Sequence, residues 1–190
     1  MKQHIDTSLL DRAITFAVKA HQGMERKGKG FPYIVHPMEA VCIVATMTND
    51  QELLAAAALH DVIEDTDTTA DDLKKEFGER VAMLVEAESD DKTGGSKAET
   101  WHQRKQDTLD RLRNADLDIK IVALGDKLSN MRAIWRDYQV QGDGLWQIFH
   151  VKDKPSHAWH YRGLASSLSE LSDSFAYQEF VRLIDDVFGK

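Results

Sequence analysis

The sequence predicts an all-α fold, a bundle-like single domain spanning residues 1–190, from three observations. Prolines are sparse, with 3 among 190 residues. The long stretches between them place apolar residues at helical spacing. β-branched residues gather only at 33–35 and 119–122, and the second run lies inside a clean helical pattern. Because proline breaks helices and β-branched runs favour strands, this distribution favours helices throughout.

In the first half of the chain we expect helices at 9–20, 37–47, 51–65 and 79–89, and a short one within 65–78. A glycine-rich loop at 28–33 precedes Pro37, which suits a first helical turn because its missing N–H is not needed there. The segment 65–78 carries a threonine cap, an acidic first turn and a glycine stop.

In the second half, a polar loop at 89–97 is followed by expected helices at 99–114 and 117–138. The C-terminal third, from Trp146 to Val187, supplies two more. No internal repeat or linker stands out, which supports one domain.

Composition excludes several classes of protein. The apolar share of 42% is that of a globular protein, which excludes intrinsic disorder. The net charge of −8 argues against a nucleic-acid binder with a broad basic surface, although it allows a local pocket for a small anion. The single cysteine, Cys42, excludes a disulfide framework and a cysteine-built zinc site. Without a long apolar stretch or an apolar signal segment, we expect a cytoplasmic protein that does not span a membrane.

The segment LLAAAALHDVIEDT is the most informative stretch of the sequence. On a continuous helix, His60, Asp61, Glu64 and Asp65 fall within an arc of about 140°, on the face that begins with Leu53 and Leu54. Ionised groups on a core-facing stripe are costly unless they are paired or bind a cation. The alternative interpretation is a solvated helix end.

The segment IKIVALGDKLSNMRAIW is apolar on two faces, and Asp126 lies alone in the second. An arginine in the core could pair with it instead of a metal. His36 directly precedes Pro37, at the junction of a loop and a helix, where a structural role is also open. Together with His60 and Asp61 these residues give two imidazoles and two carboxylates, a ligand set that suits Mn²⁺, Fe²⁺ or Zn²⁺.

Basic residues lie where an anionic substrate could use them. They are Arg26, Lys27 and Lys29 in the glycine-rich stretch, Lys92 and Lys97 in the loop at 89–97, and Arg104 and Lys105 on the following helix. A basic loop beside a metal indicates phosphate chemistry, although any one of these residues could simply be solvated.

Four separated motifs now add up to a family resemblance. AHQGMERKGKGFPYIVHP, ALHDVIEDTDTT, FGERVAMLVE and GDKLSNMR occur in this order over about residues 8–170. They resemble the HD-type hydrolase domain of RelA/SpoT homologues, in particular the stand-alone small alarmone hydrolases. Some single-domain relatives share a WxxRKQ pattern, matched at Trp101 to Gln106, and a late W-x-Y-R element, matched at Trp159 to Arg162.

The resemblance implies an HD-type helical bundle that hydrolyses a small nucleotide. The 3′-pyrophosphate of (p)ppGpp would be removed, giving GDP or GTP and pyrophosphate. The length leaves no room for the synthetase domain of the longer enzymes, so we expect degradation only. The implied residues are His36, His60, Asp61 and Asp126 as ligands of one Mn²⁺, Glu64 and Asp65 as the groups that orient and deprotonate water, and Arg26, Lys27, Asn130, Arg104 and Lys105 as substrate contacts.

Two positions depart from the longer enzymes, which usually have Ala and His where this chain has Gly125 and Ser129. Neither departure changes an expected metal ligand. The one at position 129 is expected to affect recognition of the nucleobase. Two alternative functions stay open: the same chemistry on (p)ppApp or on the 2′-phosphate of NADPH, and a catalytically silent nucleotide-binding module. The presence of Glu64 and Asp65 argues against silence, because a binder needs no water-activating acids. The sequence leaves the oligomeric state open.

Overall fold

The computed structural model describes residues 5–89 and 100–189, and helices build the fold in both ranges. Within these ranges the chain forms no sheet, and one isolated antiparallel bridge joins Glu25 to Pro32. The all-α prediction is therefore confirmed. Lys92 and Lys97 lie outside the described residues.

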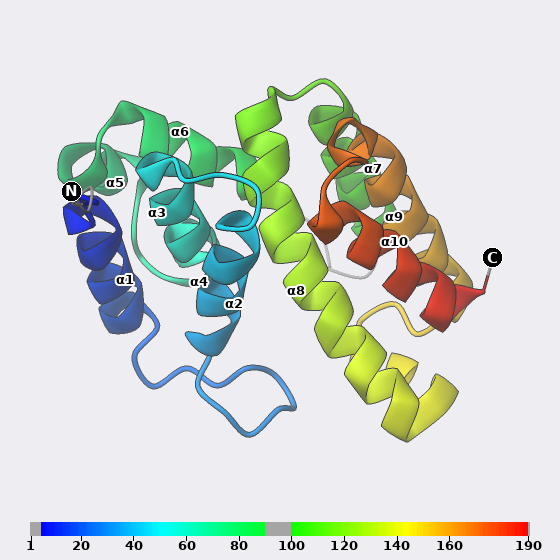
Figure 1. The fold of residues 1–190 in the computed structure, drawn as a ribbon. Helices are drawn as coiled ribbons and strands as arrows, with labels where there is room; N and C mark the ends of the chain where they lie inside the picture. Colours follow the sequence, from blue (N-terminus) through cyan, green and yellow to red (C-terminus); the bar gives the residue numbers. More distant parts are fainter. Residues whose placement is uncertain (1–4, 90–99, 190) are drawn as a thin grey trace.

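The helices follow one another closely along the chain (Figure 1). The first group comprises α1 (Ser8–Ala20), α2 (Val35–Val44), α3 (Gln51–Leu59), α4 (Val62–Asp65), α5 (Ala70–Phe77) and α6 (Glu79–Glu88). The second comprises α7 (Trp101–Arg113), α8 (Leu117–Gln141), α9 (Lys154–Ser167) and α10 (Phe175–Phe188), with 3₁₀ turns η1 (Gly142–Ile148) and η2 (Ser169–Leu171).

The prediction of one continuous helix over 51–65 is wrong, because His60 and Asp61 form a turn between α3 and α4, although both keep right-handed helical dihedrals. Nδ1 of His60 lies 2.8 Å from the carbonyl oxygen of Ala57. A side chain bound to the backbone in this way competes with the regular ladder of helix hydrogen bonds. The break separates the site-facing His60 and Asp61 from Glu64 and Asp65.

Two other boundaries differ from expectation. Helix α2 begins at Val35, so His36 lies inside its first turn and not on the loop before it. Helix α8 continues to Gln141, where Gly142 with φ 54° ends it. The predicted cap of α5 is confirmed: the Thr69 hydroxyl accepts from the backbone of Asp72, and Gly78 with φ 94° ends the helix.

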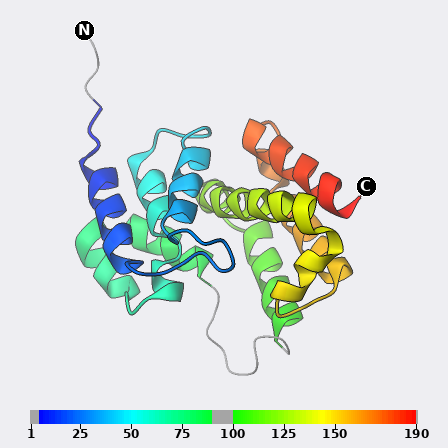
Figure 2. The same ribbon diagram turned by 90° about the horizontal axis from the view of Figure 1, so that it is seen from below.

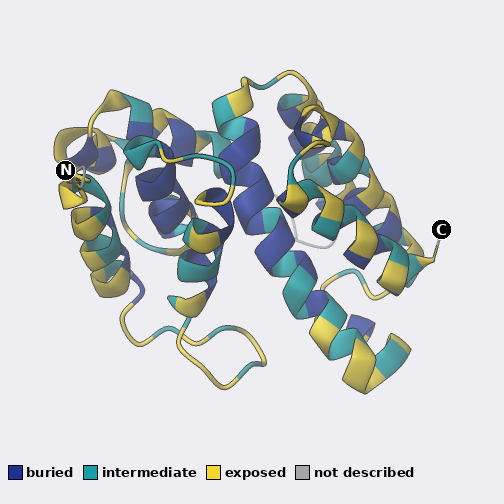
Figure 3. Cartoon of the chain, viewed as in Figure 1, coloured by how far each residue is buried: buried dark blue, intermediate teal, exposed yellow. Residues whose placement is uncertain are grey.

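Helix α8 is the central element of the molecule. It crosses between α1–α6 on one side and α7, α9 and α10 on the other, in both views (Figures 1 and 2). Its residues from Lys120 to Ile134 include most of its buried positions, whereas the end near Val140 is exposed (Figure 3). Side chains from α8 can therefore face both groups. None of the helices in the described ranges combines the length and the apolar character that a bilayer span requires.

Gly125 allows α8 to pack closely against α2. A Cβ atom at this position would lie 2.6 Å from Cγ2 of Val44 and 3.1 Å from the carbonyl oxygen of Ala40. Val44 is fully buried, so its methyl group has little room to move. The departure from alanine at this position therefore has a packing reason in this chain.

We expect Gly125→Ala to lower the free energy of unfolding by about 1–2 kcal/mol, because overpacking outweighs the gain in helix propensity. Urea unfolding measures the change. Combining it with Val44→Ala should cost less than the sum of the two single changes. Gly144→Ala is the control, since an added Cβ there meets nothing within 4 Å. Unchanged stability of Gly125→Ala would contradict this account of the packing.

An ion pair joins α8 to α10 and should make stability depend on pH. Nε and Nη2 of Arg132 donate to the two carboxylate oxygens of Glu179 at 2.8 and 2.7 Å. These bonds hold the pKa of Glu179 below its usual value of 4.5. A lowered pKa stabilises the fold above that usual value, and the contribution is lost as pH falls through the folded-state pKa.

Glu179→Gln should therefore cost about 0.2–1 kcal/mol near neutral pH, the range for partly exposed pairs. The difference from the unsubstituted protein should shrink as the pH falls below 4.5 and the carboxyl group becomes protonated. Chemical unfolding at several pH values measures it. A difference that does not vary with pH would show that the pair contributes nothing to stability.

Candidate metal centre and active site

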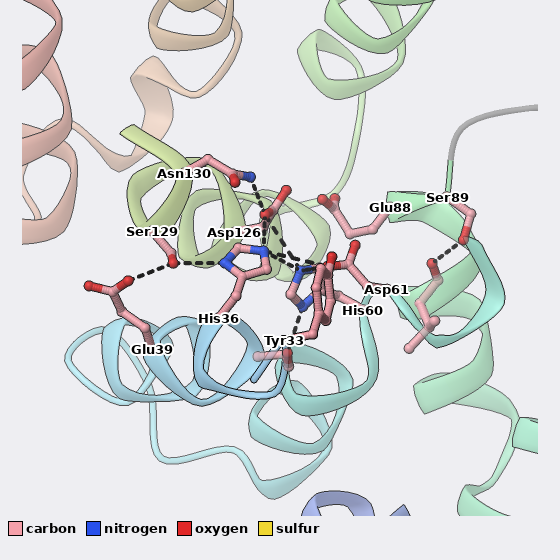
Figure 4. Close-up of polar contacts among 12 residues, drawn as sticks. Tyr33, His36, Glu39, His60, Asp61, Glu88, Ser89, Asp126, Ser129 and Asn130 are labelled. Carbon is pink, nitrogen blue, oxygen red and sulfur yellow. Dashed lines mark hydrogen bonds and ion pairs between the residues drawn. The ribbon is translucent and has the colours of Figure 1, made fainter. Parts of the chain in front are cut away.

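Two imidazoles and two carboxylates converge where α2, the end of α3 and α8 meet (Figure 4). Nε2 of His36 lies 3.2 Å from Nε2 of His60, and 3.0 Å from Oδ1 of Asp126. Oδ2 of Asp61 lies 2.9 Å from Nε2 of His60 and 3.4 Å from Nε2 of His36. His36, His60 and Asp126 are buried, with exposed fractions of 4%, 2% and 7%. Four potential ligand atoms thus face one point.

Each ring makes a hydrogen bond through the nitrogen that points away from the cluster, and these two bonds determine which nitrogen faces the common point. The Ala57 carbonyl can only accept a hydrogen bond, so Nδ1 of His60 carries a proton, and the neutral ring has its lone pair on Nε2. The Ser129 hydroxyl donates to Oε2 of Glu39 at 2.7 Å, so its oxygen accepts from Nδ1 of His36 at 2.8 Å. In the neutral form, both rings therefore adopt the tautomer whose Nε2 lone pair faces the common point, the form that binds a metal.

Further contacts hold the two carboxylates. The Tyr33 hydroxyl donates to Oδ2 of Asp61 at 2.6 Å. Nζ of Lys127 donates to Oδ2 of Asp126 at 2.6 Å, and Nδ2 of Asn130 donates to Oδ1 of Asp126 at 2.5 Å. The cation beside Asp126 is thus Lys127, its neighbour on α8, and not the core arginine of the alternative interpretation.

The charges of the cluster shift its pKa values in opposite directions. Burial alone would lower the pKa of His60, but Asp61 and Asp126 raise this pKa well above its usual value. Burial opposes ionisation of the two carboxylates, yet His60 lowers the pKa of Asp61, and Lys127 that of Asp126, well below the usual range. Both carboxylates are therefore ionised at neutral pH.

The donor set fits a divalent cation. Two lone-pair nitrogens 3.2 Å apart have no stabilising arrangement without a proton or a cation between them. Two carboxylates beside them supply negative charge, and His36, His60 and Asp126 each offer a ligand atom within 4.8 Å of the others. Imidazole nitrogen and carboxylate oxygen together are ligands of first-row divalent metals.

The cluster opens into a cavity of about 260 Å³ between the two groups of helices. One wall comes from the first group and α8, the other from α7, the turn after η1, and α9. Its lining includes Arg26, Tyr33, His36, Asp61, Glu64, Glu88, Trp101, Lys105, Thr108, Asp126, Lys127, Asn130, Phe149, His157, His160 and Tyr161. Arg26, Lys105 and Lys127 line it beside four carboxylates, so a bound divalent cation would give the cavity the net positive charge that favours an anion.

The structure divides the two predicted water-activating acids between two adjoining cavities. Glu64 is exposed and lines the cavity that contains His36 and Asp61. Asp65, also exposed, lines a second cavity of about 330 Å³ with Lys27. Their exposure fits the solvated helix end, whereas His60 and Asp61 belong to the buried cluster.

The predicted substrate contacts also fall into different places. Arg26 and Asn130 line both cavities, and Nη2 of Arg26 donates to Oδ1 of Asn130. The guanidinium group of Arg26 also lies over the ring of Tyr33, 5.3 Å from its centre. Lys105 lines the first cavity. Arg104 lines neither of the two cavities, and its Nε donates to the hydroxyl of Thr100.

Sequence reasoning missed several residues of the site. Lys29, which the sequence did single out, lines the second cavity and pairs there with Asp137 of α8. Glu88 has a buried side chain, and burial raises its pKa although Lys127 lies 3.2 Å away. Trp101 packs against His157 and other rings of α9. The WxxRKQ and W-x-Y-R patterns marked Trp101 and Tyr161, but nothing local marked Glu88 or the histidines of α9.

Comparison with known proteins agrees with this geometry. A family model described as HD domain matches residues 13–147. The chain belongs to the HD domain family. The hydrolases of this family depend on a metal, and the cluster of His36, His60 and Asp126 is a possible metal site in this HD domain.

Several relatives carry the name guanosine-3′,5′-bis(diphosphate) 3′-pyrophosphohydrolase. MESH1 of Mus musculus is 34% identical over 157 residues, which cover 77% of this chain and 85% of the relative. The protein of Aquifex aeolicus is 36% identical over 126 residues, which cover 66% of this chain and only 18% of the relative. This HD domain thus spans most of the length of MESH1 but only a small part of the longer proteins.

Solved structures share the fold. A structure described as a metazoan ortholog of SpoT that hydrolyzes ppGpp superposes with a TM-score of 0.76 at 23% identity, covering 96% of this chain and 97% of the other. A protein of Listeria monocytogenes EGD-e gives a TM-score of 0.72 at 26% identity, covering 84% and 99%. The helical arrangement is therefore that of solved HD-type structures.

We expect the purified protein to carry one divalent cation per chain. His60→Ala and Asp126→Ala should each lose it, because each change removes a convergent donor atom. Elemental analysis after gel filtration measures the metal. His102→Ala is the matched control, since His102 is exposed and contacts Ser156 away from the cluster. Full occupancy in either site variant would remove that residue from the ligand set.

Proposed function

We propose that this HD domain, as a single unit over 1–190, is a Mn²⁺-dependent hydrolase that removes the 3′-pyrophosphate of ppGpp and pppGpp. The observation that carries the proposal is the buried cluster of His36, His60, Asp61 and Asp126 at the floor of a cavity with basic side chains. The name shared by MESH1 and the other relatives supports the choice of substrate. We also propose that the protein acts in the cytoplasm on a nucleotide, not on nucleic acid.

The four residues of the cluster would hold the metal. Nε2 of each imidazole and one oxygen of each carboxylate are the donor atoms that face the common point. A divalent cation bound there polarises a phosphoryl oxygen and lowers the pKa of water. Mn²⁺ accepts both nitrogen and oxygen ligands. Tyr33 and Lys127 keep the carboxylates in place through their own hydrogen bonds.

Glu64 is the best placed group to accept a proton from the attacking water. It lines the same cavity as Asp61 and Asp126, and its exposure leaves room for a water molecule beside it. Attack of that water on the 3′-bound phosphorus breaks the bond between this phosphorus and the ribose 3′ oxygen. One proton of the water passes to Glu64 and then to the 3′ oxygen, which leaves as the ribose 3′ hydroxyl, and Asp65 assists from the adjoining cavity.

The remaining basic and polar groups would bind the substrate. Arg26, Lys27 and Asn130 lie along the two adjoining cavities, and Lys105 reaches the first from α7. Arg104 would approach the substrate from the same helix only if its side chain turned towards the cavity. A few cations suffice for a small nucleotide, so a protein with a net charge of −8 can still hold its anionic phosphates.

The experiment incubates the purified protein with Mn²⁺ and either ppGpp, pppGpp, ppApp or NADPH, and separates the products by chromatography. We expect GDP or GTP and pyrophosphate from the guanosine substrates. Turnover of ppApp or of the 2′-phosphate of NADPH alone would keep the chemistry and change the substrate. Binding of ppGpp without turnover of any compound would favour the silent nucleotide-binding module and overturn the proposal.

Glu64→Gln and Asp65→Asn should leave the metal content unchanged while kcat falls by about 10²–10⁴, the usual worth of general acid–base help. The loss should be larger for Glu64→Gln, because Glu64 shares a cavity with the metal cluster. Steady-state kinetics and elemental analysis on the same samples measure both effects. Asp67→Asn, an exposed acid in the same segment, is the control. Loss of metal together with activity would mean that these acids are ligands.

A further inference from the structure

A chain of hydrogen-bonded side chains lies behind His36, on the side of the ring opposite the cavity (Figure 4). Nδ1 of His36 is 2.8 Å from Oγ of Ser129, and this hydroxyl donates to Oε2 of Glu39 at 2.7 Å. Ser129 is 2% exposed, so water cannot readily replace its hydrogen bonds. We propose that Glu39 and Ser129 are positioning residues that hold the His36 ring in its metal-binding form.

The direction of the hydrogen bonds follows from the chemistry of the groups. A serine hydroxyl has one proton, and a carboxylate can only accept. The proton of Ser129 therefore points to Glu39, and the serine oxygen must accept from Nδ1–H of His36. This arrangement keeps the lone pair on Nε2, which is 3.0 Å from Oδ1 of Asp126. Through the Ser129 hydroxyl, the negative charge of Glu39 also makes the His36 ring more basic and therefore a stronger metal ligand.

Glu39 is itself fixed from the other side. Nη1 of Arg132 donates to Oε1 of Glu39 at 3.3 Å, and Nη1 of Arg136 lies 3.9 Å from the same atom. Arg132 is in turn held by Glu179 of α10. One oxygen of Glu39 thus meets cations and the other meets Ser129, so the carboxylate cannot turn away without breaking contacts at both ends.

The two histidines differ in what supports them. Nδ1 of His60 binds the backbone carbonyl of Ala57, which no side-chain substitution removes. The ring of His36 depends on two side chains instead, one on α2 and one on α8. Ser129 follows Asp126 by three residues, so the two lie on neighbouring positions of one face of α8. Helix α8 therefore supplies one donor atom directly and orients another.

This inference rests on the proposed role of His36 as a metal ligand. Without Ser129 the ring loses the acceptor that fixes its tautomer, and a fraction of molecules then present a protonated Nε2 to the metal. Outer-shell partners of this kind typically change metal affinity by about 10- to 100-fold when they are removed. The expected defect is a loss of metal affinity that the accompanying loss of stability does not explain.

The experiment measures the dissociation constant for Mn²⁺ alone, from the electron paramagnetic resonance signal of free Mn²⁺, with no nucleotide present. Ser129→Ala should raise the constant by about 10- to 100-fold. Glu39→Gln keeps an acceptor oxygen and loses the charge, so its effect should be smaller. Because Glu39 acts through Ser129, the double variant should match Ser129→Ala and not the product of the two effects.

Ser167→Ala is the matched control, because Ser167 is also a buried serine and donates one bond, to the carbonyl of Leu109. It should leave the Mn²⁺ constant unchanged, and its melting temperature in EDTA should fall about as much as that of Ser129→Ala. Unchanged Mn²⁺ affinity in Ser129→Ala would overturn the positioning role and leave the proposed function standing. A protein that binds no Mn²⁺ before any substitution would overturn both.

Discussion

The buried meeting of two imidazole nitrogens and two carboxylates is the constraint on which the rest of the structure depends. Nε2 of His36 and Nε2 of His60 lie 3.2 Å apart, with oxygens of Asp61 and Asp126 close to both. Such an arrangement is stable only with positive charge at its centre. Helices α2, α3 and α8 must therefore meet within a narrow tolerance at this point.

Close packing at Gly125 helps to bring helices α2 and α8 together at this point. It lets α8 approach the backbone of Ala40 and the side chain of Val44, both on α2. His36 belongs to the same helix, and Asp126 directly follows Gly125. The contact that brings the helices together thus also sets the distance of 3.0 Å between His36 and Asp126. Around them, Lys127 and Arg26 place cationic groups among the carboxylates of the cavity.

Apolar spacing predicted most helices, because burial of one face is a local property of the sequence. The same reasoning found Asp126 as a lone carboxylate on an apolar face, and the cap of α5 from Thr69 and Gly78. The break at His60 was missed, because it accompanies a bond from that ring to the Ala57 carbonyl, and no periodicity reports such a bond.

The contacts that organise the site join residues far apart in the chain. His36 meets Ser129 across 93 positions, and Arg26 meets Asn130 across 104. No local pattern carries such pairings, so Ser129 stood out only as a departure expected to affect base recognition. The structure instead gives it a buried place behind His36. The catalytic and substrate-binding roles of Glu64, Asp65 and the basic residues remain predictions.

The central claim is that four residues hold one divalent cation at the floor of the cavity. Diffraction from crystals grown with Mn²⁺, recorded on both sides of the manganese absorption edge, locates the metal without reference to activity. The account predicts a single anomalous peak per chain within bonding distance of His36, His60, Asp61 and Asp126. A peak elsewhere, or no peak at this cluster in Mn²⁺-saturated crystals, would contradict it.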